Sequence, residues 1–142
     1  MKISARNTFE GTITKLTDGA VNAEVELTTA GGDKIVAIVT EGSVKSLGLA
    51  VGKKAVAFAK APWVTLMTGE PTIRFSTRNQ LSGTVKKVIK GAINTEVALE
   101  LPGGTTVNAV ITNEAATDLG LKEGLKAQAL IKASHIILGV PA

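Results

Sequence analysis

The residues of this chain that are best suited to chemistry are basic, and each of them occurs twice. Arg6 lies in the segment SARN and Arg78 in the segment STRN, 72 positions later. Lys60 and Lys132 have the same spacing and lie in KAPW and KASH. A guanidinium fork, an ammonium and neighbouring hydroxyl or backbone N–H donors suit a small tetrahedral dianion, whose oxygens accept hydrogen bonds. A lone basic residue is usually a solvated surface charge, but two kinds kept in both repeats favour a binding role.

Residues for catalysis are scarce. The chain has no cysteine and one histidine, which excludes disulfides, cysteine-ligated metals and thiol nucleophiles. His135 stands beside the apolar run 136–138, as expected of a histidine at the edge of a core, and Trp63 takes its place in the first repeat. Glu24 and Glu96 alternate with apolar neighbours and are interpreted as solvated or interface carboxylates. Phosphate-loop, zinc-helix and nucleophile-elbow motifs are absent, so we expect no enzyme activity.

The basic pairs belong to an internal repeat that spans almost the whole chain. Residues 4–66 align with residues 76–138 without a gap, and about 26 of the aligned positions are identical. Residues 1–66 carry eight basic and six acidic side chains, as do the remaining residues, so neither half is a charged tail. The sequence predicts two domains, residues 1–66 and 75–142, joined by a linker at residues 67–74.

Each repeat is expected to form five short strands and one helix. Alternating apolar residues predict the strands, and glycine pairs at 31–32 and 103–104 predict hairpin turns. The third strand of each repeat is apolar on both faces, so we expect it to be central in its sheet. The expected strands are residues 9–14, 21–27, 35–39, 54–60 and 63–67 in the first repeat, with counterparts that include 93–101, 107–111, 126–132 and 135–140 in the second.

The helix of each repeat is expected between the third and fourth strands. Thr40 and Thr112 can cap its start, and Gly48 and Gly120 can end it in a left-handed conformation. This order of elements is that of a small Greek-key barrel of the OB type. The predicted fold is all-β with one short helix per repeat, arranged as two tandem OB-like five-stranded barrels.

Composition is compatible with an anionic partner outside a membrane. The formal net charge is +4, which suits nucleic acid, acidic lipid or a small oxyanion. The N-terminus lacks the apolar run of a signal peptide, and no apolar stretch reaches the roughly 18 residues that span a membrane. We therefore expect a cytoplasmic protein.

Several motifs of both repeats resemble the Mop module of the molbindins, a family of molybdate-binding proteins. They are SARN and STRN at the start, GAVNAEV and GAINTEV in the second strand, GG at the hairpin, ITNEA with LGL at the helix, and IKAS at the end. The resemblance covers essentially both repeats and implies a tandem, or di-Mop, arrangement. It also implies OB-like modules around a threefold axis, with molybdate held between neighbouring subunits of a homotrimer.

The resemblance implies which residues hold the oxyanion. One half of the main sites would be Ser4, Ala5, Arg6, Lys60 and Ala61, and the other half Ser76, Thr77, Arg78, Lys132, Ala133 and Ser134. A second type of site near the symmetry axis has weaker candidates in Gly19, Ala20, Val21, Asn22 and Ser43, and in Gly91, Ala92, Ile93, Asn94 and Asn113. Thr77 departs from Ala5, and Pro62 lacks the hydroxyl and N–H of Ser134, so the two kinds of main site should differ.

Three functions remain after the sequence is read. The leading hypothesis is a protein that binds molybdate, and tungstate with it, for storage and homeostasis, without a cofactor or a directly ligated metal. Regulators and transporters with this module also need a DNA-binding or ATPase domain, and we do not expect 142 residues to accommodate one. The alternative is a tandem OB protein that binds single-stranded nucleic acid, although only Phe9, Phe58, Trp63 and Phe75 are available for base stacking. A structural module without a ligand would leave the repeated Arg and Lys unexplained.

Overall fold

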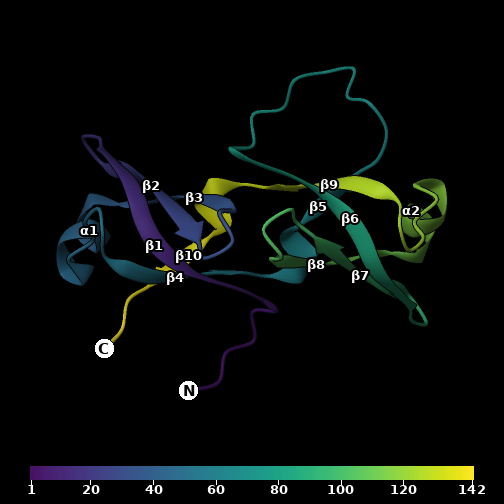
Figure 1. The fold of residues 1–142 in the computed structure, drawn as a ribbon, viewed down its shortest axis with the longest axis horizontal. Coiled ribbons are helices and arrows are strands. Elements are labelled where there is room, and N and C mark those ends of the chain that lie inside the picture. The colour runs from purple at the N-terminus through teal and green to yellow at the C-terminus, as the bar shows by residue number, and fades with distance from the viewer.

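Ten strands form two five-stranded sheets in the computed structural model, which describes all 142 residues (Figure 1). The first repeat contains β1 (Asn7–Asp18), β2 (Asn22–Thr29), β3 (Lys34–Thr40), α1 (Glu41–Leu47), β4 (Lys54–Ala59), the 3-10 helix η1 (Ala61–Trp63) and β5 (Thr65–Met67). The second contains β6 (Asn79–Lys90), β7 (Asn94–Glu100), β8 (Thr106–Thr112), α2 (Asn113–Asp118), β9 (Lys126–Ile131), η2 (Ala133–His135) and β10 (Ile137–Gly139). The predicted all-β fold with one short helix per repeat is confirmed.

Local signals in the sequence set the two helices. The Thr40 side chain accepts a hydrogen bond from the Ser43 N–H at 3.1 Å, and Thr112 does the same for Ala115 at 3.1 Å. Each hydroxyl satisfies a backbone donor that the first turn of a helix leaves free. Gly48 ends α1 with a φ of 63°, a conformation that favours glycine. The threonine caps and the glycine ends were predicted, and the structure has them.

The last strand of each repeat belongs to the sheet of the other repeat. The strand orders are β10-β4-β1-β2-β3 and β5-β9-β6-β7-β8. β10 pairs antiparallel with β4, and β5 pairs antiparallel with β9. The expectation that residues 63–67 and 135–140 close their own barrels is therefore wrong. After β4 and β9 the short 3-10 turns η1 and η2 redirect the chain across the interface, so each sheet is completed by the other repeat.

The expectation that the third strand is central is also wrong. β3 and β8 lie at the ends of the two strand orders, and β1 and β6 occupy the middle. The end strands β3 and β8 are apolar on both faces because the other repeat covers their second face: η2 packs against β3, and η1 packs against β8. The apolar pattern was correctly recognised, but the burial comes from the partner repeat and not from flanking strands.

Two buried asparagines bind the exposed backbone edges of these end strands. The amide of Asn79 donates to the Val36 carbonyl at 2.7 Å, and the Val36 N–H donates to the Asn79 Oδ1 at 2.8 Å. Asn7 makes the equivalent pair with the backbone of Asn108, at 2.8 and 2.6 Å. Both asparagine side chains are only 1% exposed. Each amide mimics a neighbouring strand, and the reciprocal contacts relate the repeats by an approximate twofold symmetry.

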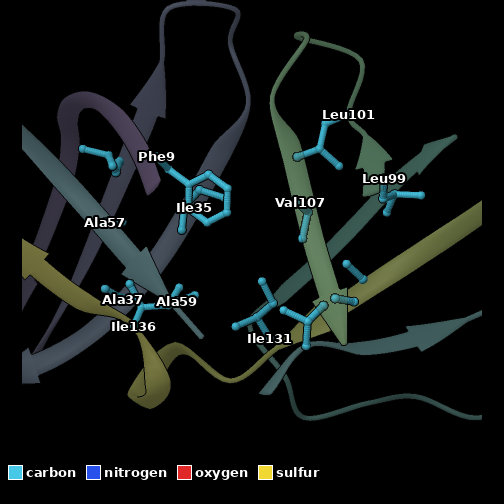
Figure 2. Packing of buried hydrophobic residues seen from close by; sticks show 14 of the residues in the cluster. Phe9, Ile35, Ala37, Ala57, Ala59, Leu99, Leu101, Val107, Ile131 and Ile136 are labelled. Atoms are coloured by element: carbon cyan, nitrogen blue, oxygen red, sulfur yellow. The ribbon is translucent and has the colours of Figure 1, made fainter. Parts of the chain in front are cut away.

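One apolar core runs through both repeats. A single cluster of 23 buried residues joins the inner faces of the two sheets. Figure 2 shows part of it, with Ile136 of the second repeat among the residues of the first sheet, near Ala37 and Ala59. The repeats seen in the sequence, residues 4–66 and 76–138, are therefore not separate packing units, because the core contains residues of both. The chain between β5 and β6 makes a wide loop (Figure 1) and contains all of the expected linker at 67–74 except Met67, which is the last residue of β5.

The hairpin tips of the two repeats meet on the same side of the molecule. The carboxylate of Asp33 accepts hydrogen bonds from the N–H groups of Gly103 at 3.0 Å and Thr105 at 3.2 Å. A Cβ atom at Gly31 would collide with the backbone carbonyl of Gly103. Glycine is needed here because two backbones approach each other closely. Together with the buried asparagines, this contact holds the two repeats against each other.

Asn79→Ala should lower the free energy of unfolding by about 2–4 kcal/mol, measured by urea denaturation. It removes the side-chain bonds to Val36 and Ile131 and leaves both backbone groups of Val36 without partners. Asn94→Ala is the matched control, since Asn94 is exposed and its side chain makes no hydrogen bond; it should change stability by about 0.5 kcal/mol or less. Equal losses for the two variants would contradict a structural role for the buried amide.

Candidate functional site

Strand pairing places the predicted basic segments next to each other. Because Asn7 pairs with Ala59 in the β1–β4 ladder, the segment 4–6 and the residues Lys60 and Ala61 extend from the same end of this strand pair. Asn79 pairs with Ile131 in the same way, and residues 76–78 therefore adjoin Lys132 and Ala133. Each Arg is thus neighbour to the Lys of its own repeat, at the junction with the other repeat.

Arg6 faces a small cavity between the repeats. The cavity has a volume of about 150 Å³ and is lined by Arg6, Ala61, Glu96, Asn108, Ala109 and Val110. Two of these residues come from the predicted half-site of the first repeat, and four come from β7 and β8 of the second. The Asn108 amide also approaches the Arg6 carbonyl at 3.5 Å. Residues of the second repeat therefore line the cavity beside the predicted half-site of the first repeat, and one of them, Glu96, is a carboxylate.

Arg78 is engaged by a carboxylate of the first repeat. Its Nη2 lies 2.5 Å from the Oε1 of Glu24, and the two side chains are 53% and 33% exposed. Glu24 is thus an interface carboxylate, one of the two readings that the sequence left open. Arg6, the equivalent arginine, forms no ion pair. The two arginines therefore have different electrostatic surroundings although their local sequences match.

The remaining candidates for the main sites differ in burial. Ala61 and Ala133 are buried, whereas the side chains of both lysines and of the candidate serines are exposed. Thr77, where the first repeat has Ala5, has a buried hydroxyl without a hydrogen-bond partner. A buried hydroxyl without a partner is uncommon in folded proteins, so Thr77 adds an available donor beside Arg78.

The candidates for the second type of site also come together, with different chemistry in the two repeats. The Asn113 amide donates to the Gly91 carbonyl at 3.0 Å and accepts from the Thr95 hydroxyl at 2.7 Å. In the first repeat Glu41 takes the place of Asn113, and its carboxylate accepts from the Gly19 N–H at 3.2 Å. A carboxylate at this turn repels an anion, whereas the neutral amide of Asn113 does not. The turn residues Ala20, Val21, Ala92, Ile93 and Asn94 are exposed.

A further cavity joins candidates of both site types. It has a volume of about 320 Å³, and Asn22, Ser43 and Ser134 line it together with apolar residues of α1, β3 and β10. The Ser43 hydroxyl lies 2.9 Å from that of Thr40, so it is already engaged at the helix cap. Strand exchange brings Ser134 to this place, which the sequence alone did not predict.

His135 and Trp63, which occupy equivalent positions in the two repeats, contact each other. Their ring centroids lie 4.7 Å apart with the planes inclined by 46°. His135 is half-buried, in agreement with the interpretation as a core-edge histidine. Trp63 is the one exposed Phe or Trp side chain, at 50%, so the surface offers little for stacking nucleic-acid bases. No cluster of three His, Asp or Glu residues could hold a metal ion, and no helix has the length and apolarity to span a membrane.

Comparison with known proteins places these repeats in a family. The TOBE domain family matches the chain twice, at residues 3–66 and 76–138. The chain belongs to the TOBE domain family. The two matched ranges agree with the repeat found in the sequence, and each contains one Arg and one Lys of the candidate sites.

The relatives of this tandem TOBE chain carry names that refer to molybdenum. The molybdenum-pterin-binding protein MopA of Rhodobacter capsulatus is 45% identical over 141 residues, which are 99% of this chain and 53% of MopA. The molybdenum transport protein ModE of Azotobacter vinelandii is 41% identical over 140 residues, 99% of this chain and 52% of ModE. The chain thus spans about half the length of the curated relatives it matches. The predicted resemblance to the Mop proteins is confirmed.

A solved structure matches the tandem TOBE chain over its whole length. It is that of ModG, described as a cytoplasmic molybdate-binding protein and solved with molybdate bound. ModG is 57% identical, the match covers 99% of this chain and 100% of ModG, and the TM-score is 0.94. The two barrel-like modules of this chain are therefore arranged as in ModG.

Sequence reasoning left one pair of residues around the candidate site undecided and missed another residue. Glu24 and Glu96 were recognised as a repeated pair, but nothing in their spacing indicates that each faces the other repeat. Asn108 was missed altogether, because its counterpart in the first repeat is Val36 and both are used through their backbone. The repeated Asn7 and Asn79 were an available signal, since a polar residue kept beside a core strand in both repeats suggests a buried hydrogen bond.

Proposed function

We propose that this protein binds molybdate as the intact oxyanion and serves molybdenum storage and homeostasis in the cytoplasm. The observation that supports this most is the match to ModG over the full length of both chains, with a TM-score of 0.94 and 57% identity. The names of MopA and ModE also refer to molybdenum. Tungstate, a tetrahedral dianion of similar size, should bind at the same places. Molybdate is a ligand here and not a cofactor.

The main sites are proposed at the two junctions between the repeats. Arg6 would donate in the planar fork geometry of its guanidinium, and Lys60 would supply a second positive charge from the adjacent strand end. Arg78 and Lys132 would do the same in the second repeat. Backbone N–H groups and hydroxyls complete the donor set, in a first half-site of Ser4, Ala5, Arg6, Lys60 and Ala61 and a second of Ser76, Thr77, Arg78, Lys132, Ala133 and Ser134.

The second type of site is proposed at the turn that adjoins each helix. In the second repeat it would use Gly91, Ala92, Ile93, Asn94 and Asn113, where Asn113 contributes a neutral amide. In the first repeat it would use Gly19, Ala20, Val21, Asn22 and Ser43. The carboxylate of Glu41 lies at that turn and lowers its affinity for an anion. The second repeat is therefore the stronger candidate.

A homotrimer is proposed as the binding form. Val21 and Ile93 hold equivalent positions in the two repeats and are 73% and 77% exposed. Ile137, in the exchanged strand β10, is exposed as well. Exposed apolar residues at equivalent places suit contacts between subunits, and the family resemblance suggests three of them around one axis. Each main site would then be completed by a neighbouring subunit.

Molybdate and tungstate should bind more tightly than sulfate. All three are tetrahedral dianions, so charge does not separate them, and discrimination must come from the distances between donors. Equilibrium dialysis of the purified protein, with metal analysis of both compartments and sulfate as competitor, measures this. Retention of sulfate equal to that of molybdate would contradict the proposal.

Arg6→Ala and Arg78→Ala should each weaken one class of site by about ten- to a hundredfold, because each removes a charge-assisted hydrogen bond worth about 1.5–3 kcal/mol. The loss should be larger for Arg6, since Pro62 cannot donate where Ser134 can. Thermal melting serves as the control for folding. The double variants Arg6→Ala/Lys60→Ala and Arg78→Ala/Lys132→Ala should show non-additive losses if each pair shares a site. Unchanged molybdate binding in both single variants would exclude these arginines as ligands.

Binding should require the oligomer. Light scattering or native mass spectrometry of the unliganded and molybdate-loaded protein should give a trimer, and Val21→Asp/Ile93→Asp should weaken both assembly and binding, because charges would enter apolar contacts. Lys90→Asp, on an exposed strand end, controls for the change in charge. A monomer that retains full molybdate binding would contradict sites shared between subunits.

A further inference from the structure

Two acidic residues face the arginines of the proposed sites from across the interface. Glu24 and Glu96 are equivalent residues of β2 and β7. Glu24 forms the ion pair with Arg78. Glu96 lines the cavity that Arg6 also lines. Arg78 is thus paired with a carboxylate of the other repeat, and Arg6 shares a cavity with the equivalent carboxylate. The proposed ligand sets contain neither carboxylate.

These carboxylates oppose an oxyanion at the same place. A dianion that approaches Arg78 meets a guanidinium whose charge is already compensated by Glu24, at a distance of 2.5 Å. If Glu24 stayed in contact, its one negative charge and the two charges of the dianion would lie next to the same guanidinium. The positive charge of the neighbouring Lys132 would offset only part of this. Like charges at contact distance repel one another, and removal of the Glu24 carboxylate from the guanidinium relieves that repulsion.

The geometry points to Glu24 as the counter-ion that molybdate must displace from Arg78, with Glu96 in the corresponding position toward Arg6. This inference rests on the proposed molybdate function and identifies what regulates affinity at that site. Glu24 holds the guanidinium and compensates its charge. On binding, the guanidinium exchanges the carboxylate for the oxyanion, so Glu24 keeps the affinity lower than the donors alone would make it.

The two repeats differ in this exchange. Arg78 starts from a formed ion pair, whereas Arg6 forms none and lies beside a cavity of about 150 Å³. Ligand binding at Arg6 requires no ion pair to be broken. The site of Arg6 should therefore fill at a lower molybdate concentration, and removal of Glu96 should change its affinity less than removal of Glu24 changes that of the Arg78 site.

The test is the affinity for sodium molybdate of Glu24→Gln, measured by equilibrium dialysis on the full chain. Glu24→Gln should tighten one class of site by about three- to tenfold, since a partly exposed ion pair and the repulsion of the dianion are both removed. Glu26→Gln is the matched control. Glu26 is two residues further along β2, and its carboxylate lies near Lys34 and Thr14, so the net charge changes equally without a change at either arginine. Its affinity should stay within about twofold of the wild type.

Each outcome separates the alternatives. A weaker affinity for Glu24→Gln would overturn the inference, because Glu24 would then position Arg78 for the ligand. Equal affinities for Glu24→Gln, Glu26→Gln and the wild type would overturn it as well. Glu96→Gln provides an independent variant and should tighten binding at the Arg6 site by a smaller factor. An unchanged affinity of Glu96→Gln would show that Glu96 does not compete with the ligand for Arg6. If the wild type itself retains no molybdate, the proposed function fails, which is a different result from an unchanged variant.

Discussion

Reciprocal completion of one repeat by the other is the constraint on which the rest of the structure depends. Each sheet lacks a strand until β5 or β10 arrives from the other repeat. Each end strand, β3 or β8, has a backbone edge that is satisfied only by a buried asparagine from across the interface. A buried backbone group without a partner is costly, so neither repeat is satisfied alone. The single apolar core that spans both sheets follows from the same exchange.

This exchange also determines what the candidate sites are made of. Asn7 and Asn79 begin β1 and β6, and their side chains reach the end strand of the other repeat. The arginine that precedes each asparagine therefore lies at the same junction. The guanidinium therefore reaches β2 or β7 of the other repeat, where Glu24 and Glu96 lie, while its own lysine remains at the neighbouring strand end. The residues that make the interface and those proposed to bind the oxyanion are thus adjacent in sequence. A change that weakens the interface should weaken the site, which is why thermal melting serves as the control for the arginine variants.

Much of the fold could be predicted from the sequence because its signals are local. Alternation, hairpin glycines and the threonine caps depend on a few neighbouring residues, and the repeat supplies each signal twice. Strand exchange could not be predicted, because β5 and β10 are three residues long and their apolar alternation fits either sheet. The adjacency of each Arg and Lys follows from antiparallel pairing. The facing carboxylates depend on how two complete repeats dock, and spacing along the chain does not encode that.

Fusion of two repeats in one chain permits the two junctions to differ. In an assembly of identical single repeats, both arginines would have the same surroundings. Here Pro62 stands opposite Ser134 in the alignment, and Glu41 opposite Asn113, so donor number and charge vary independently at the two ends of the molecule. The backbone frame that holds them is the same in both. The common backbone fixes where the donors lie, and the residues that differ between the repeats determine the number of donors and the charge. Two site classes with different affinities can therefore exist in one fold. A protein with two site affinities takes up and releases its ligand over a wider range of concentration than one with a single affinity.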